Sequence, residues 1–403
     1  MAVIGSHDLP ALQKPFTPTL GLAIAPLHTP YYEGSGGIFL RLSNNKDDNR
    51  IGLLTCAHVS HPPPVFQKGE KYSSPRNDVI LLGTGAFNTA VHNIILFIRH
   101  QLFTIIHREQ DLADLPAQEE GEAGKITAKR KQLIRLIKTA RAELKEAEEL
   151  HTYVTKNFTT FESRMLGFAL HSAKVEVGAD KFLYDWSVIQ LDNDKIDLAE
   201  FKGNRLFVGA SLSLSSLLSL YFSPRLTDPT FLSYTGGTKV PFAWYRYMYP
   251  RTKDRPRDPP MEGGMLLPLK GHVTEAEWRN PQDLDTYNKK ALLAVKNGRT
   301  TGTTFGRVNG LESVIRNGTS QPALQFLVCG YDREINDPNT QFSDAGDSGS
   351  FVVARDGRLI GQLTGGGGPR ADRMERSYIT PYYALKAALD QKFPGCHLLD
   401  VDT

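Results

Sequence analysis

Residues 344–353 read Asp-Ala-Gly-Asp-Ser-Gly-Ser-Phe-Val-Val, and this stretch decides the fold of the chain. A serine, Ser348, stands between Asp347 and Gly349 at the mouth of an apolar strand. Gly346 can adopt backbone angles that would strain a residue with a Cβ, so its own N–H can point outward. The N–H groups of Gly346 and Ser348 would then converge on the oxygen of a carbonyl under attack. The stretch therefore predicts an exposed nucleophilic hydroxyl beside an oxyanion hole.

Two upstream segments supply the partners that such a serine needs. Residues 51–59 read Ile-Gly-Leu-Leu-Thr-Cys-Ala-His-Val, an apolar strand that ends in small residues just before His58. Residues 182–191 read Phe-Leu-Tyr-Asp-Trp-Ser-Val-Ile-Gln-Leu, which sets Asp185 inside a strand-like run. A carboxylate there is costly to bury unless a hydrogen-bonding group meets it, and orienting a histidine is the usual solution. We therefore predict a catalytic triad of His58, Asp185 and Ser348.

The order histidine, aspartate, serine and the surrounding motifs resemble the trypsin/chymotrypsin superfamily of serine proteases. Residues 295–308 resemble the K-x-G-x-T-T-G-x-x-x-G strand of the streptogrisin and glutamyl-endopeptidase branch. Residues 359–366 are similar to the strand that lines the specificity pocket, and 378–381 to the closing strand before the final helix. The Gly-rich hairpin at 34–40 fits as well, and all these pieces occur in chain order.

The resemblance implies a mainly β protein with two six-stranded antiparallel β-barrels, an inserted α-helical hairpin and a C-terminal helix. It also implies a serine endopeptidase that acts on a polypeptide substrate through an acyl-enzyme intermediate. Gly346 and Ser348 would form the oxyanion hole. Asp347 would be a buried carboxylate that holds the oxyanion loop, as the matching residue does in trypsin-like enzymes by meeting a newly cut N-terminus. No activation site is visible here, so an internal cation is one candidate partner.

The resemblance also locates the substrate pocket, and the chain departs from two known specificities there. Counting back six residues from Ser348 puts Phe342 at the pocket base, where an aspartate would select Arg or Lys. Leu363 stands where glutamyl endopeptidases carry a histidine. We expect a shallow apolar pocket for small or medium uncharged side chains. Its substrate-binding residues would be Phe342, Ser343, Thr364, Gly365 and Gly366.

Composition narrows the class of protein. Of 403 residues 40% are apolar and 23% charged, and the net charge of +3 gives no bulk case for nucleic-acid binding. The odd number of cysteines, 3, favours a reducing compartment. No secretory signal is visible at the N-terminus, and no run of 18 or more apolar residues suggests a membrane span. We expect a cytoplasmic protein.

No cofactor or metal site is expected, since Cys56, Cys329 and Cys396 show no zinc-ligand spacing. Cys56 lies near His58, but the nucleophile position already holds a serine. We therefore interpret Cys56 as a small buried residue.

The chain divides into three regions. Residues 1–200 form an N-terminal lobe that carries His58 and Asp185. Residues 201–290 form an inter-lobe region with insertions, and residues 291–403 form a C-terminal lobe that carries Ser348 and the final helix. Thr380 is the predicted N-cap of that helix, with Pro381 in its first turn.

A helical insertion at 86–160 interrupts the N-terminal lobe. Apolar residues recur at helical spacing from about 86 to 112, and again from about 125 to 158, where they form a stripe close to a heptad seam. An acidic, Gly-containing stretch at 111–124 separates the two segments, so we expect an antiparallel hairpin. The stripe would close the hairpin on itself or onto the barrel, or bind a protein partner. A run of 7 basic residues between 125 and 141 fits a solvated helix face.

A second hypothesis makes the chain a protease-fold scaffold with little activity. Its hairpin would recruit protein partners in a signalling or defence assembly. The large insertion motivates this alternative, and the intact triad residues argue against it.

Overall fold

The structure is a computed structural model of the 403-residue chain. It describes residues 9–63, 76–116, 123–192, 194, 195, 201, 203–209, 232–235, 238–258, 260–262, 265–316, 321–330, 341–367 and 376–399. The chain forms two compact units. One comprises Met1–Lys14, Phe87–Ser163 and Leu212–Asp228, and the other comprises Pro15–Ala86, Arg164–Ser211 and Pro229–Thr403.

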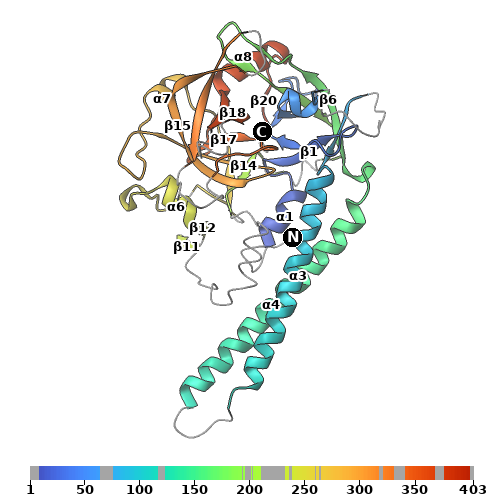
Figure 1. The fold of residues 1–403 in the computed structure, drawn as a ribbon, viewed down its shortest axis with the longest axis vertical. Coiled ribbons are helices and arrows are strands. Elements are labelled where there is room, and N and C mark those ends of the chain that lie inside the picture. The colour runs from blue at the N-terminus through green and yellow to red at the C-terminus, as the bar shows by residue number, and fades with distance from the viewer. Residues whose placement is uncertain are drawn as a thin grey trace. The chain divides into compact units, whose positions relative to one another are not determined.

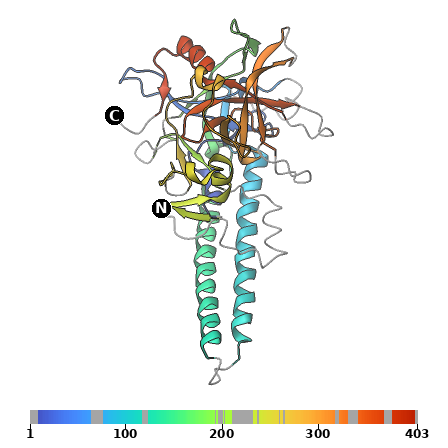
Figure 2. The ribbon, with the colours of Figure 1, turned by 90° about the vertical axis from the view of Figure 1, so that its left-hand side faces the viewer.

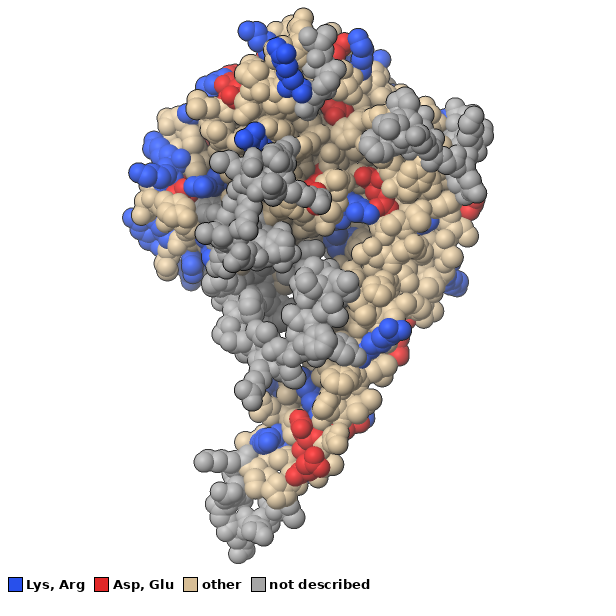
Figure 3. Space-filling view, in the orientation of Figure 1, with Lys and Arg blue, Asp and Glu red and all other residues tan. Residues whose placement is uncertain are grey.

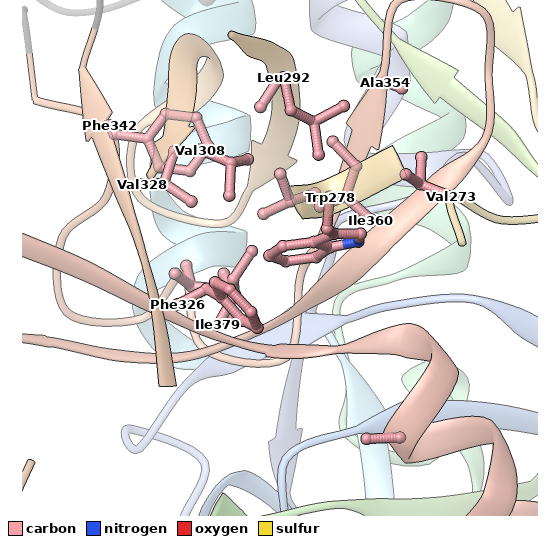
Figure 4. Packing of buried hydrophobic residues seen from close by; sticks show 14 of the residues in the cluster. Val273, Trp278, Leu292, Val308, Phe326, Val328, Phe342, Ala354, Ile360 and Ile379 are labelled. Atoms are coloured by element: carbon pink, nitrogen blue, oxygen red, sulfur yellow. The ribbon is translucent and has the colours of Figure 1, made fainter. Parts of the chain in front are cut away.

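A closed barrel of antiparallel strands forms the C-terminal half of the larger unit (Figure 1). Its strands in spatial order are β14 (Leu292–Gly298), β15 (Gly302–Ile315), β16 (Ala323–Gly330), β19 (Arg376–Pro381), β18 (Leu359–Gly367) and β17 (Phe351–Ala354). Apolar side chains from alternate positions of these strands fill the interior (Figure 4). Trp278 and Phe326 lie at the centre, with ring centroids 4.2 Å apart. The six-stranded barrel predicted for this region is confirmed.

The N-terminal half of the same unit is a curled antiparallel sheet. Its strands in spatial order are β2 (Gly34–Gly36), β1 (Leu22–Pro26), β5 (Asp78–Leu81), β6 (Met165–Ser172), β9 (Ser187–Leu191), β4 (Ile51–Thr55), β3 (Phe39–Arg41) and β20 (His397–Leu398). The chain end contributes the last strand, since β20 pairs with β3. Among the described residues this sheet has eight strands, with β2 and β20 at its edges, where the sequence predicted a closed six-stranded barrel.

Shorter elements connect and cover these sheets. The helices are α1 (Leu9–Gln13), η1 (Lys14–Phe16), α2 (Ala57–Ser60), η3 (Glu162–Arg164), α6 (Phe242–Met248), η5 (Thr252–Asp254), α7 (Glu275–Arg279) and α8 (Tyr382–Lys392). The strand pairs are β7 (Glu176–Val177) with β8 (Leu183–Tyr184), β10 (Arg205–Phe207) with β13 (Leu266–Pro268), and β11 (Leu232–Thr235) with β12 (Thr238–Pro241).

The smaller unit contains the two long helices of the insertion, α3 (Thr84–Ala113) and α4 (Ala123–Asn157). They run side by side in both views (Figures 1 and 2). Ile105, Ile137 and Ala140 form a buried cluster between them. Arg141 pairs with Glu109 at 2.5 Å, so the predicted antiparallel hairpin is confirmed and closes on itself.

Two features of the hairpin bear on the partners expected for it. Both signs of charge appear along the face seen in Figure 3, and the basic residues from Lys129 to Arg141 are exposed. The helix α3 is long and apolar enough to cross a membrane, judged by length and composition alone. From the sequence we expected no membrane-spanning segment, and a helix of this length and composition was not anticipated.

Two local expectations were wrong. Residues 182–191 are not one strand, because β8 ends at Tyr184 and β9 begins at Ser187, with Asp185 and Trp186 between them. The break lets the Asp185 carboxylate turn toward His58 instead of following the strand pleat. Thr380 does not cap α8, because it lies within β19 and its hydroxyl donates to the Leu183 carbonyl at 2.8 Å. Pro381 takes the N-cap position, without a side-chain cap.

Candidate active site

His58 and Asp185 form a hydrogen-bonded pair. His58 lies on the short helix α2, directly after β4, and Asp185 lies in the break before β9, which pairs with β4. The His58 Nδ1 and Asp185 Oδ2 atoms are 2.5 Å apart, and the His58 backbone N–H donates to Asp185 Oδ1 at 3.1 Å. Only 5% of the Asp185 side chain is exposed, so both of its oxygens meet a partner where water is scarce. The carboxylate therefore fixes the orientation of the imidazole ring.

The loop 344–350 presents two backbone N–H groups that have no hydrogen-bond partner among the described residues. Gly346 has φ +97°, in the left-handed region that glycine tolerates, as the sequence predicted. A Cβ at this position would lie 2.5 Å from Thr300 Oγ1. Within the described part of the chain, neither the Gly346 N–H nor the Ser348 N–H donates a hydrogen bond, whereas the N–H groups of Asp347 and Gly349 do. Two free donors flanking one residue are what an oxyanion hole needs.

The serine loop packs against the residues that precede His58. Gly349 has φ +92°, and a Cβ there would lie 2.4 Å from Thr55 Oγ1 and 3.3 Å from Cys56 N. The Ser348 carbonyl accepts the Ser35 N–H at 2.8 Å. The Ser348 side chain is half-buried. Among the described residues no hydrogen bond joins its hydroxyl to His58, so the structure links His58 to Asp185 and packs Gly349, the residue after Ser348, against Thr55 and Cys56.

Asp347 is held by a buried lysine. The side chains of Asp347 and Lys296 are both 0% exposed, and Lys296 Nζ lies 3.2 Å from Asp347 Oδ2. The carboxylate also accepts the N–H groups of Thr300 and Asp344 at 2.8 and 3.0 Å and the Thr301 hydroxyl at 2.7 Å. Burial acts to raise the pKa of Asp347, but the Lys296 charge and these hydrogen bonds bring it below its ordinary value. The internal cation considered from the sequence is Lys296.

The larger unit combines a closed six-stranded barrel with a curled antiparallel sheet. Solved structures similar to the chain include a glutamic-acid-specific serine protease that uses a histidine triad in substrate binding. That structure has a TM-score of 0.38 and 8% identity, and the match covers 94% of this chain and 100% of that one. A Nocardiopsis protease has a TM-score of 0.37 and 10% identity, over 94% and 97% of the two chains. A Cellulomonas bogoriensis chymotrypsin has a TM-score of 0.25 and 12% identity, over 58% and 90%.

No protein-family model matches the chain, and no curated protein matches its sequence. The site is therefore interpreted from its own geometry.

The Cys56 thiol is close enough to raise the question of a metal site. Its Sγ, a ring nitrogen of His58 and a carboxylate oxygen of Asp185 all lie within 4.8 Å of one another. The 2.5 Å between His58 Nδ1 and Asp185 Oδ2 suits a hydrogen bond. Two ligands that each sit about 2 Å from one tetrahedral zinc would be about 3 Å or more apart. Burial raises the pKa of Cys56 well above its ordinary value, and the thiol donates to the Leu363 carbonyl at 3.3 Å. These contacts favour a protonated structural thiol.

The predicted substrate-binding residues divide into two groups. Phe342 is fully buried in the barrel core, where it lies beside Val308 and Val328 (Figure 4). Ser343 is also buried, and its Oγ lies 2.6 Å from Ser377 Oγ. A pocket at this position would therefore have two features at its base. One is the Phe342 ring, which faces the core, and the other is the pair of Ser343 and Ser377 hydroxyls.

The second group lies on β18. Thr364 accepts a hydrogen bond from the buried Gln325 amide and donates to the Tyr378 carbonyl at 3.3 Å. A Cβ added to Gly365 would meet no atom of the described residues within 4 Å, whereas one on Gly366 would lie 3.1 Å from the Arg376 carbonyl. Open space beside Gly365 is consistent with a strand edge that receives a peptide.

Sequence reasoning missed two residues of this site. Ser35 accepts the Arg299 N–H and donates to the Gly346 carbonyl, both at 3.0 Å. Gln325 supports Thr364 from β16. Ser35 stands directly before the Gly36-Gly37 pair, and this local pattern could have indicated it. No local pattern indicates Gln325, because it reaches Thr364 from another strand.

Proposed function

We propose that the chain is a serine endopeptidase that uses His58, Asp185 and Ser348. The observation that carries the proposal is the His58–Asp185 pair, together with a serine loop that packs against Thr55 and Cys56 and has two N–H groups unpaired among the described residues. Since Nδ1 of His58 faces the carboxylate, Nε2 is the nitrogen left to accept a proton.

The reaction follows from these groups. His58 Nε2 takes the proton of the Ser348 hydroxyl as its oxygen attacks the peptide carbonyl, and Asp185 stabilises the resulting imidazolium. The Gly346 and Ser348 N–H groups stabilise the oxyanion, each by about 3–4 kcal/mol. His58 then protonates the leaving amine, and water hydrolyses the acyl-enzyme by the same route.

Two further features belong to the proposal. The Lys296–Asp347 pair supports a loop that is set without a newly cut N-terminus, so proteolytic activation is not required. Phe342 and Leu363 support a preference for uncharged side chains on the acyl side of the bond cut, as opposed to Arg, Lys or Glu.

A fluorophosphonate probe tests the mechanism, because it labels only an activated serine. The wild type should be labelled and Ser348→Ala should not, and this substitution should lower kcat on a peptide substrate by about a million-fold. Iodoacetamide should leave the activity unchanged, because the Cys56 thiol is fully buried. Equal labelling of both proteins, or of neither, would overturn the mechanism and leave the scaffold hypothesis.

A further inference from the structure

The carboxylate of Glu33 lies where the inserted hairpin joins the larger unit. Glu33 is only 4% exposed, and its Oε1 accepts the backbone N–H of Ala86 at 2.7 Å. Ala86 is in the first turn of α3 and is the last residue before the smaller unit begins at Phe87. Glu33 therefore satisfies one of the N–H groups that have no partner inside a helix.

The second oxygen of Glu33 is bound by Arg299. Arg299 Nη2 donates to Glu33 Oε2, and the Arg299 Nη1 donates to Thr300 Oγ1 at 3.3 Å. The Thr300 hydroxyl donates in turn to the Ala345 carbonyl at 2.5 Å. Arg299 lies in the turn between β14 and β15, so this turn connects Glu33 to the loop that carries Ser348.

The Ala345 carbonyl matters because it belongs to the same peptide group as the Gly346 N–H. This peptide group is planar, and its C=O and N–H bonds point in opposite directions. A contact that holds the carbonyl oxygen therefore fixes the direction of the N–H. The Arg299 backbone holds the next peptide too, because its N–H donates to Ser35 Oγ, which donates to the Gly346 carbonyl. Both peptide groups of Gly346 are therefore positioned from the Arg299–Thr300 turn.

The close approach of these parts needs small residues. A Cβ on Gly83 would lie 2.5 Å from Glu33 Oε1, and one on Gly85 would lie 3.1 Å from Arg299 Nη2. Both distances are shorter than ordinary van der Waals contact. The glycines thus allow the start of α3 to contact the ion pair directly.

We propose that Glu33 and Arg299 are positioning residues, through which the start of the inserted hairpin sets the direction of the Gly346 N–H in the oxyanion hole. The inference rests on the proposed protease function and deepens it. The polar chain from the Ala86 N–H through Glu33, Arg299 and Thr300 to Ala345 carries the effect. A displacement of the first turn of α3 moves the Glu33 carboxylate. Through Arg299 and Thr300 this movement changes the direction of the Gly346 N–H, which stabilises the transition state.

The first test compares Glu33→Gln and Arg299→Met with a matched control, Asp285→Asn. Asp285 is equally buried, pairs with Arg307 at 2.7 Å and accepts the N–H groups of Tyr287 and Lys289, but it lies away from the serine loop. Hydrolysis of a peptide p-nitroanilide should show kcat lowered about 10- to 100-fold in the two test variants, with KM within about twofold of wild type. Inhibition by a peptide aldehyde, whose adduct places an oxyanion in the hole, should weaken by a similar factor. Asp285→Asn should keep the kcat, the KM and the aldehyde inhibition of the wild type.

A second readout separates this inference from the proposed function. Hydrogen exchange of the full chain should become faster in Glu33→Gln at the bonded N–H groups of Thr300 and Asp347 and in the first turns of α3, but not in Asp285→Asn. If the wild type neither cleaves peptides nor reacts with the phosphonate while this exchange pattern holds, the protease proposal fails and the coupling stands. If the wild type is active and both test variants match the control in kcat and exchange, the coupling is refuted.

Discussion

At the scale of single residues, the site depends on charges that are buried in pairs. Asp185 meets His58 through both carboxylate oxygens, and Asp347 meets Lys296 while neither side chain is exposed. Removing one member of such a pair leaves an uncompensated charge in a place that water cannot reach, which costs more than the pair contributes when intact. The buried Asp347 carboxylate, directly before Ser348, therefore requires the Lys296 ammonium.

Replacing this lysine should cost both stability and activity. Lys296→Met leaves the Asp347 carboxylate buried without a cation, so we expect a loss of about 3–5 kcal/mol in the free energy of unfolding. Because Asp347 then no longer holds the loop through the same contacts, kcat should also fall. Urea unfolding and peptide hydrolysis measure the two effects. Lys270→Met, at an exposed position, is the control, and a result no larger than the control's would contradict the role given to Lys296.

At the scale of elements, β18 combines a tight and an open glycine. Its pairing with β19 shifts between Leu363 and Gly365, so Thr364 lies at a bulge. At Gly361 a Cβ would lie 2.5 Å from the Thr380 carbonyl, whereas at Gly365 it would meet no atom of the described residues within 4 Å. One glycine is needed for packing of the barrel, and the other leaves open space beside the strand.

Substituting the two glycines should separate these roles. Gly365→Ala should fold with wild-type stability and raise KM for a peptide substrate on the order of tenfold, since the added methyl group occupies the space in which the substrate backbone would lie. Gly361→Ala should instead lower the unfolding temperature, because its Cβ meets backbone. Thermal unfolding and steady-state kinetics distinguish them. An unchanged KM in Gly365→Ala would show that peptides do not bind along this edge.

At the scale of the whole molecule, long-range polar contacts join distant parts of the chain. The buried Asn204 accepts the Phe39 N–H at 2.7 Å, and its amide donates to the Phe39 and Leu399 carbonyls. Buried carboxylates also tie distant segments together. Burial acts to raise the pKa of Asp285, but hydrogen bonds from the Lys289 N–H and the Arg307 guanidinium bring it below its ordinary value.

The stability of the molecule should therefore decrease in acid. A carboxyl whose pKa is lower in the folded state binds fewer protons there, so its contribution is present above about pH 4 and is lost as pH falls through the folded pKa. Asp285 and Asp347 both act in this direction. Urea unfolding at pH 6 and pH 3 should show the loss, and Asp285→Asn should reduce its size. Equal stability of the wild type at both pH values would contradict this account.

Several features could be predicted because their signals are local. The glycine at 346 has the positive φ that its setting before Asp347-Ser348 required, and the heptad-like stripe of 125–158 gave the hairpin and its buried Ile137 and Ala140. The strand break at Asp185 and the cap of α8 were missed, since partners on other segments override the local pattern. His58 attracts the Asp185 carboxylate, and the Leu183 carbonyl takes the Thr380 hydroxyl.

From the sequence one could derive the C-terminal barrel, the inserted hairpin and the positive φ of Gly346 before Ser348, because periodicity and backbone preference act over a few residues. The surroundings of the stretch 344–353 follow from the tertiary structure alone. Lys296 neutralises Asp347, Ser35 and Thr300 hold the peptides of Gly346, and Glu33 accepts an N–H in the first turn of α3. These contacts join residues up to 311 positions apart, and their energies depend on burial and charge, which no local pattern records.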